Sequence, residues 1–166
     1  TRRQFVSASA TATAAMLVPR HVLGGPGYVA PSDKLNIAIV GAGGMGKENA
    51  EKMLSENIVA VCDIDFPYVD RQIETKLKDS EGKPRPQGEQ LKQAFARAAR
   101  YSDFRVMLER QRDIDAVVIA TPDHTHAIIA DTAMKLGKHV YVQKPLTATV
   151  HEARVLRETA RTTGVV

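Results

Sequence analysis

Four short segments of the sequence carry residues that could do chemistry. The first is GAGGMG at residues 41–46, whose glycines follow the spacing G-x-G-x-x-G. The others are Asp63 at the end of VAVCD, TPDHTH at residues 121–126, and QKP at residues 143–145. They offer backbone amides for an anion, a carboxylate, two histidines and a lysine. Because glycine clusters also mark turns that bind nothing, the surrounding elements decide what these residues do.

The glycine run predicts a cradle for a pyrophosphate, the alternative being a plain turn between a strand and a helix. Gly41 permits a tight turn, Gly43 lets the backbone approach the phosphates, and Gly46 lets the next helix pack on the preceding strand. The N-terminus of that helix then presents free N–H groups to the anion. Gly44 and Met45 complete the turn, and we expect them to contact the cofactor as well.

Asp63 predicts which dinucleotide binds. It lies 17 residues after Gly46, at the end of the second expected strand, where a carboxylate can accept hydrogen bonds from both adenosine ribose hydroxyls. A 2′-phosphate would meet like charge there, and Ile64 supplies no positive charge to hold it. We therefore expect NAD rather than NADP. Asp65 is better interpreted as the N-cap of a helix that includes Pro67.

The histidines and the cysteine bear on metal and redox chemistry. His124 and His126 form an H-x-H pair, but the sequence shows no third ligand, so we interpret them as capping or packing residues and expect no metal site. Cys62 is the only cysteine, which excludes an intrachain disulfide. Thiolate zinc clusters and iron–sulfur clusters lack ligands for the same reason.

Apolar runs and amphipathic segments alternate around these residues. Buried apolar runs predict strands at residues 35–40, 58–62, 116–120 and 139–142, and Val165 with Val166 resembles the start of a further strand. Helical patterns follow the glycine turn and cover about residues 68–78, 89–100, 101–110, 127–136 and 149–161.

Several residues predict where these helices pack, start and stop. In the helix after the glycine turn, one broad apolar face holds Met45, Ala50, Met53 and Leu54. Pro84 and Pro86 predict a polar loop that no helix crosses. Thr149 and Glu152 form a capping box, and Gly137 and Gly164 end the last two helices.

This order of elements predicts an α/β domain with a doubly wound parallel sheet, covered by helices on both faces. In such sheets, ligands lie beyond the carboxyl ends of the strands, at the point where the strand order reverses. All four chemical segments fall at strand ends, and this coincidence favours a binding site over isolated turns.

The same segments resemble the Gfo/Idh/MocA oxidoreductases, named for glucose-fructose oxidoreductase and inositol dehydrogenase. The resemblance covers about residues 33–166 and rests on GAGGMG, the acidic end of VAVCD, and the run DAVVIATPDHTHAIIADTAMKLGKHVYVQKPLT. It implies an N-terminal NAD(P)-binding Rossmann domain. A larger α/β domain that binds a sugar or cyclitol and builds a homo-oligomer would normally follow, and we expect that domain to be missing from this chain.

The resemblance also assigns residues to the cofactor. Thr121 and Pro122 would line the nicotinamide side, and Asp123 stands where asparagine is common in the family. His126 matches the family's histidine at the start of the following helix. We expect all four to belong to the cofactor site.

The QKP segment matches the family's Glu-Lys-Pro motif, with Lys144 and Pro145 in place and Gln143 replacing the glutamate, and the resemblance implies that all three belong to the cofactor site. The family's lysine is held to assist proton transfer at the carbinol being oxidised, which makes Lys144 the expected catalytic residue. A lysine suits that role when burial or a neighbouring cation lowers its pKa. Gln143 keeps a hydrogen-bonding group there but loses a charge.

These residues predict the cofactor domain of an NAD-dependent dehydrogenase acting on a sugar or polyol. One alternative is a glycosidase that uses bound NAD for transient oxidation and elimination. Another is a non-catalytic protein that keeps the nucleotide fold.

Charge and hydropathy exclude other partners. The 166 residues hold 23 Lys and Arg against 19 Asp and Glu. The first thirty residues contain Arg2, Arg3, Arg20 and no acid, so the rest is nearly neutral, which argues against nucleic acid. No run approaches the ~20 apolar residues that a membrane span needs.

Residues 1–32 are expected to be an export leader followed by a Gly/Pro linker, before a cofactor domain at residues 33–166. Paired arginines, Phe5 and a stretch rich in Ala, Thr and Ser resemble a twin-arginine signal. A periplasmic location is therefore expected, and a cytoplasmic one if the leader is not functional.

Replacing Arg2 and Arg3 by lysine should leave the protein in the cytoplasmic fraction, because twin-arginine export depends on the arginine pair. Cell fractionation and immunoblotting measure the distribution. Unchanged localisation of the variant would contradict the export prediction.

Overall fold

The computed structural model describes Ala30 and residues 33–166 of the chain. The predicted leader and linker at residues 1–32 lie outside these residues except for Ala30, so export stays a prediction. Residues 35–166 form a compact unit that contains all four chemical segments. Within the described part of the chain, no helix is both long enough and apolar enough to cross a membrane.

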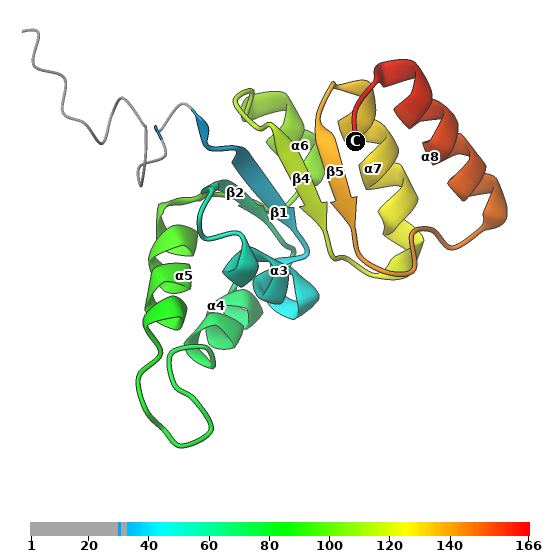
Figure 1. The fold of residues 1–166 in the computed structure, drawn as a ribbon. Coiled ribbons are helices and arrows are strands. Elements are labelled where there is room, and N and C mark those ends of the chain that lie inside the picture. The colour runs from blue at the N-terminus through cyan, green and yellow to red at the C-terminus, as the bar shows by residue number, and fades with distance from the viewer. Residues whose placement is uncertain (1–29, 31–32) are drawn as a thin grey trace, which may run out of the picture. The chain divides into compact units, whose positions relative to one another are not determined.

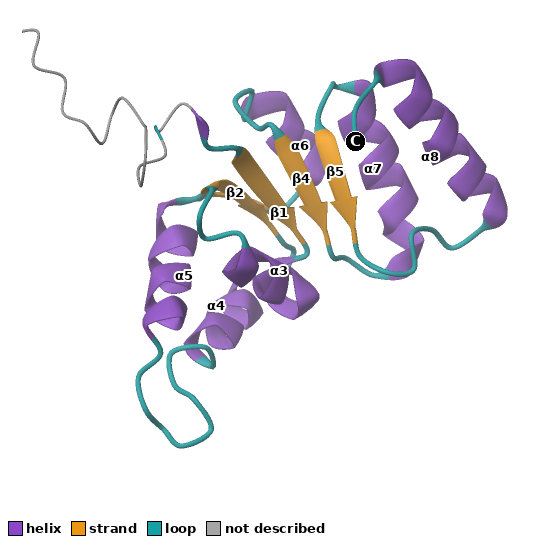
Figure 2. Ribbon diagram, in the orientation of Figure 1, coloured by secondary structure: helices purple, strands orange, loops and turns teal. Residues whose placement is uncertain are grey.

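Five parallel strands form one sheet through the centre of this unit (Figures 1 and 2). The strands are β1 Asn36–Val40, β2 Asn57–Cys62, β3 Ala99–Tyr101, β4 Ala116–Ile119 and β5 His139–Val142. They lie in the order β3-β2-β1-β4-β5, and every neighbouring pair is parallel. All carboxyl ends therefore share one edge, and the strand order reverses between β1 and β4. The predicted parallel sheet is confirmed.

Helices cover both faces of the sheet. The helical segments are η2 Ala42–Gly46, α3 Lys47–Lys52, α4 Phe66–Glu74, α5 Pro86–Arg97, α6 Phe104–Arg110, η3 Asp123–Thr125, α7 His126–Lys135 and α8 Val150–Thr163. Alternate residues of β1 divide the core: Ile37 and Ile39 pack with α3, α4 and α5, whereas Ala38 and Val40 pack with α6, α7 and α8. Successive side chains of β1 thus point to opposite faces of the sheet, and both faces are buried, as expected for a central parallel strand.

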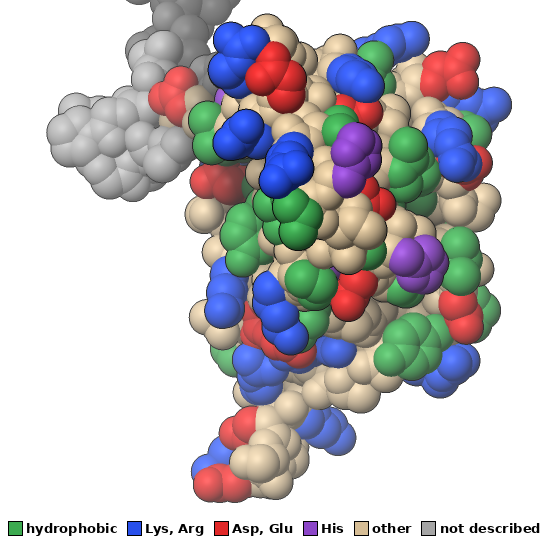
Figure 3. All heavy atoms as spheres, turned by 90° about the vertical axis from the view of Figure 1, so that its right-hand side faces the viewer, with side chains coloured by type: hydrophobic (Ala, Val, Ile, Leu, Met, Phe, Trp, Pro, Cys, Tyr) green, Lys and Arg blue, Asp and Glu red, His purple; other side chains and the backbone are tan. Residues whose placement is uncertain are grey.

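The last helix, α8, packs against α7 (Figure 1). Its predicted capping box is confirmed, because the Thr149 hydroxyl accepts from the Glu152 amide and the Glu152 carboxylate accepts from the Thr149 amide. Gly164 ends the helix in the left-handed conformation. On the side that Figure 3 presents, basic and acidic side chains are interspersed with hydrophobic ones.

The chain reaches the outer edge of β5 at Val166. Its carbonyl accepts a hydrogen bond from the Val140 amide at 2.8 Å, and its own amide donates to a ring nitrogen of His139 at 3.1 Å. Val165 and Val166 form no strand of the sheet, so the strand start predicted there is seen only as this one backbone hydrogen bond beside β5.

The region between β2 and β4 differs from the sequence prediction. Pro86 was expected to lie in a loop, but it occupies the first turn of α5. N–H groups in the first turn make no hydrogen bond within the helix, so proline is tolerated there although it lacks an N–H. Helix was also expected as far as Arg100, yet α5 ends at Arg97 and β3 follows. Three residues of an edge strand are too few to give a periodic signal, and pairing with β2 selects their conformation.

The helix after the glycine turn is less regular than predicted. Gly44, within η2, has non-helical backbone angles that interrupt the helix ahead of α3. As a result Met45 is 52% exposed instead of sharing the apolar face, whereas Ala50 is fully buried. Met53 and Leu54 pack against the core as expected.

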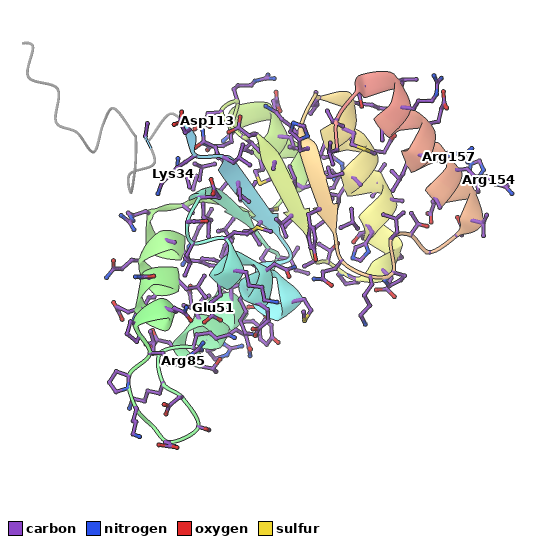
Figure 4. The ribbon with its side chains drawn as sticks, in the orientation of Figure 1. Lys34, Glu51, Arg85, Asp113, Arg154 and Arg157 are labelled. Atoms are coloured by element: carbon purple, nitrogen blue, oxygen red, sulfur yellow. The ribbon has the colours of Figure 1, made fainter. Side chains whose placement is uncertain are left out.

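A cluster of ion pairs connects α3 to the segment between α4 and α5. Lys76 contacts the carboxylates of Glu48 and Glu51, and Arg85 pairs with Glu51 (Figure 4). The side chains of Lys76 and Glu51 are largely buried, so these charges are shielded from solvent more than a surface pair would be. The cluster therefore fixes the long polar loop against the helix that follows the glycine turn.

Two glycines give the turn its shape. Gly41 has a φ of +82°, and a Cβ there would lie 2.6 Å from the backbone of Ala120. A Cβ on Gly46 would lie 2.2 Å from the carbonyl oxygen of Gly41. The predicted roles of Gly41 in the tight turn and of Gly46 in helix–strand packing are thus visible as contacts.

Gly46→Ala should destabilise the fold by about 1–3 kcal/mol or more, because the backbone of Gly41 and the helix must separate to admit a methyl group. The midpoint of urea unfolding measures the change. Gly44→Ala is the matched control, since a Cβ on Gly44 meets no atom within 4 Å. Equal stability of the two variants would contradict the packing role of Gly46.

Candidate functional site

A cavity of about 640 Å³ opens at the carboxyl ends of the strands. This volume is in the range that holds small ligands and cofactors. Its walls come from the glycine turn, the segments after β2, β3 and β4, and the start of α7. Six residues predicted for the cofactor line it: Gly41, Gly43, Gly44, Asp63, Thr121 and Pro122.

The other predicted site residues lie outside the cavity wall. They are Met45, Gly46, Asp123, His126, Gln143, Lys144 and Pro145. Gly46 lies behind the turn, against Gly41, and the QKP segment follows β5, one strand beyond the cavity. Direct contacts of these residues with the cofactor stay predictions.

The segment after β3 forms a wall that sequence reasoning missed. Ser102, Asp103, Phe104 and Arg105 line the cavity there. Asp103 is the N-cap of α6, and its carboxylate accepts from the Arg105 amide at 2.8 Å. The capping residue Asp103 could indicate from the sequence where α6 begins. The strand that brings this segment to the site, β3, is too short to show a sequence pattern.

Asp63 holds the glycine turn in addition to facing the cavity. One carboxylate oxygen accepts from the amides of Ala42 at 2.8 Å and Gly43 at 3.2 Å, and the other accepts from the Asp65 amide at 3.0 Å. A carboxylate has about four acceptor positions, so one stays available for a ribose hydroxyl. Asp63 therefore ties the end of β2 to the turn.

Asp65 caps α4, as predicted. Its carboxylate accepts from the Tyr68 amide at 2.8 Å, and Pro67 lies in the first turn. The ring of Tyr68 then covers the turn, because a Cβ on Gly43 would lie 2.6 Å from it. Gly43 thus makes room for an aromatic ring from α4 as well as for the approach of a phosphate.

Cys62 is a buried core residue at the end of β2. Burial, with smaller contributions from the negative charges of Asp103 and Asp63, raises the pKa of its thiol to about 12. The side chain therefore stays a neutral thiol, and it is no candidate nucleophile.

His126 is only 1% exposed and connects two loops at the site. Its Nδ1 lies 2.7 Å from the Pro145 carbonyl oxygen, and its Nε2 lies 2.8 Å from that of Thr121. Carbonyl oxygens only accept, so the neutral ring can donate to one of them and the doubly protonated ring to both. The ring nitrogens are thus engaged by the backbone, which disfavours the metal alternative for the pair with His124.

Among the residues that the structure describes, no three His, Cys, Asp or Glu side chains gather closely enough to hold a metal ion.

The QKP segment is fixed by its two outer residues. The Gln143 amide donates to the Ile119 carbonyl at 2.9 Å, and its side-chain Nε2 donates to Oδ1 of Asn49 on α3 at 3.0 Å. Pro145 follows a cis peptide bond, and its carbonyl oxygen lies 2.7 Å from Nδ1 of His126. Lys144 between them is exposed. Asn49 carries no motif that would have pointed to it from the sequence.

A parallel sheet with a glycine turn at the switch point and an acid at the end of β2 defines a dinucleotide-binding domain of the Rossmann class. NAD fits the residues present: amides at a helix N-terminus, open space beside Gly44, and a carboxylate at the ribose position. Residues 35–166 match the family described as "Oxidoreductase family, NAD-binding Rossmann fold". The chain therefore belongs to the Gfo/Idh/MocA oxidoreductases and is their NAD-binding domain.

Individual relatives agree with this assignment. The chain is 32% identical over 142 residues to an alpha-N-acetylgalactosaminidase of Shewanella oneidensis, covering 82% of this chain and 28% of that protein. The structure of GenD2 from gentamicin A biosynthesis in complex with NAD superposes with a TM-score of 0.62 at 27% identity, covering 90% of this chain and 36% of GenD2.

A more distant neighbour shares the fold. The myo-inositol 2-dehydrogenase of Lactobacillus plantarum has a TM-score of 0.57 at 23% identity, with coverage of 78% of this chain and 34% of that enzyme. The chain thus spans about a third of the length of the proteins it matches.

NAD should bind about tenfold or more tightly than NADP, because the 2′-phosphate would meet the Asp63 carboxylate. Asp63→Asn should narrow the difference, since it removes the charge and keeps an oxygen for the Ala42 and Gly43 amides. Isothermal titration with both cofactors measures the affinities.

Asp113→Asn is the control for this prediction, because it removes the same charge from an exposed position at the amino ends of the strands. Equal affinities of the unaltered protein for NAD and NADP would refute the role of Asp63. An identical effect of Asp113→Asn would refute it as well.

Proposed function

We propose that the protein is an NAD-dependent oxidoreductase acting on a CH–OH group of a sugar or polyol, with this chain as its cofactor domain. The observation that carries the proposal is the fixed QKP loop at the same sheet edge as the glycine turn, joined to it through the bond between Gln143 and Asn49. This bond holds a lysine-bearing loop against the helix that begins at the cofactor cradle.

NAD, when bound, supplies the hydride acceptor. The chain's own residues then have three tasks: to bind the cofactor, to shape its nicotinamide side, and to move a proton. The glycine turn and Asp63 suit the first, and Thr121 and Pro122 at the end of β4 suit the second. Lys144 suits the third: it would take the hydroxyl proton as the carbinol carbon gives up its hydride, and would return a proton in the reverse direction.

A glycosidase that oxidises its substrate transiently is the second candidate. The 32% identical relative named alpha-N-acetylgalactosaminidase favours it, as does the relative of Shewanella sp. strain ANA-3 named glycosyl hydrolase family 109 protein 1. Both candidates need the same cofactor domain and the same proton transfer at a carbinol, so they differ in what happens after the first oxidation.

Export by the leader and assembly into a homo-oligomer are further proposals. The first rests on the paired arginines and the second on the family resemblance.

Lys144→Met in the full-length protein should lower turnover by about a hundredfold or more and leave NAD affinity nearly unchanged, because it removes the proton acceptor and keeps the glycine turn and Asp63, which line the cavity. Free sugars, cyclitols and aryl glycosides are the substrates to compare. Accumulation of NADH supports the dehydrogenase, and release of the aglycone without net NADH supports the glycosidase.

Lys138→Met is the matched control, because Lys138 lies at the amino end of β5, away from the site. Turnover of Lys144→Met within a few-fold of the unaltered protein would remove Lys144 from the mechanism. NAD binding without turnover of any of these substrates would favour the non-catalytic alternative.

A further inference from the structure

Lys144 has no side-chain partner to hold it in place. It is exposed, and within the described part of the chain it makes no ion pair or side-chain hydrogen bond. A proton acceptor must nevertheless lie within hydrogen-bond reach of the hydroxyl it serves. The position of Lys144 must therefore come from the residues on either side of it in the chain.

Asn49 supplies the anchor on one side. It is 7% exposed, and its Oδ1 accepts from Nε2 of Gln143 at 3.0 Å across 94 residues of sequence. The bond spans from the first turn of α3, directly after the glycine cradle, to the residue directly before Lys144. Pro145, directly after Lys144, is anchored by His126.

The side-chain amide of Asn49 is also incompletely satisfied. Its Nδ2 is buried and has no hydrogen-bond partner among the described residues. A buried donor without an acceptor is unfavourable, and an apolar side chain of similar size would avoid that cost. Asn49 therefore contributes little to stability through its amide beyond the one bond to Gln143.

We propose that Asn49 is a positioning residue for Lys144: its bond to Gln143 sets the QKP loop relative to the cofactor cradle. The proposal rests on the proposed function, in which Lys144 moves the proton. Asn49 itself does not line the cavity, and its side-chain hydrogen bond goes to Gln143 and not to Lys144. It acts on the rate only through the loop.

Asn49→Leu in the full-length protein should lower kcat about tenfold or more while the KM for NAD stays within about twofold, because small displacements of a reacting group cost rate rather than cofactor binding. The urea midpoint should change little, since removal of the unsatisfied amide offsets the lost bond to Gln143. A merely structural role would lower the midpoint and leave the kcat of the folded fraction unchanged.

Asn57→Leu is the matched control. Nδ2 of Asn57 donates to Oδ1 of Asn36 at 3.1 Å, which makes a comparable amide pair at the amino ends of β1 and β2. Breaking it should change stability but not kcat. An equal fall in kcat for Asn57→Leu would overturn the proposal.

Gln143→Met breaks the same bond from its other partner and keeps the test decisive if Asn49→Leu does not fold. The double variant Asn49→Leu with Gln143→Met should be no slower than either single variant, because both remove one interaction. If the fold losses in kcat of the two single variants multiply in the double variant, Asn49 acts through a different interaction, and the proposal is overturned.

Lys144→Met distinguishes failure of the proposed role of Lys144 from failure of the positioning role of Asn49. If Lys144→Met retains turnover, the proposed role of Lys144 fails, and the positioning role fails with it. If Lys144→Met loses turnover and Asn49→Leu does not, the proposed function stands and the positioning role alone is wrong. If Asn49→Leu causes no further loss in the Lys144→Met background, Asn49 acts through Lys144.

Discussion

The site depends on one close contact, between the carbonyl oxygen of Gly41 and the α-carbon of Gly46. No side chain fits between them. Because of this contact, the helix that follows the turn begins directly over the end of β1, the central strand of the sheet. The amides of the turn are thereby brought under the carboxylate of Asp63, and Asn49 on the same helix is brought within reach of the loop after β5.

The loops at this edge of the sheet are joined by polar side chains that bond to backbone or amide groups of the neighbouring loop. Asp63 joins the end of β2 to the turn after β1, Asn49 joins that turn's helix to the end of β5, and His126 joins the loops after β4 and β5. Each of these side chains is short and has few rotamers, so little conformational entropy is lost in holding the edge. The cofactor cradle and the lysine-bearing loop consequently form one connected framework.

The sequence was informative where local chemistry alone selects the structure. The buried strands, the capping box at Thr149 and the N-cap at Asp65 were all predictable, since each depends on residues a few positions apart. The short strand β3 and the exposure of Met45 were not, because pairing with β2 and an irregular turn at Gly44 decide them. For the same reason the sequence did not predict the cavity wall after β3. It did not predict the role of Asn49 either, because the partner of Asn49 lies 94 residues away.

The burial of Cys62 also bears on how the domain would behave in the presence of oxidants. Exchange between thiols and disulfides proceeds through the thiolate, and so does the first step of oxidation to a sulfenic acid. A thiol that is held neutral in the core, beside the carboxylates of Asp63 and Asp103, is slow in both reactions. The thiol at the end of β2, where the cofactor's ribose is expected to bind, is therefore slow to react with oxidants, even though the protein's proposed chemistry is itself a transfer of electrons.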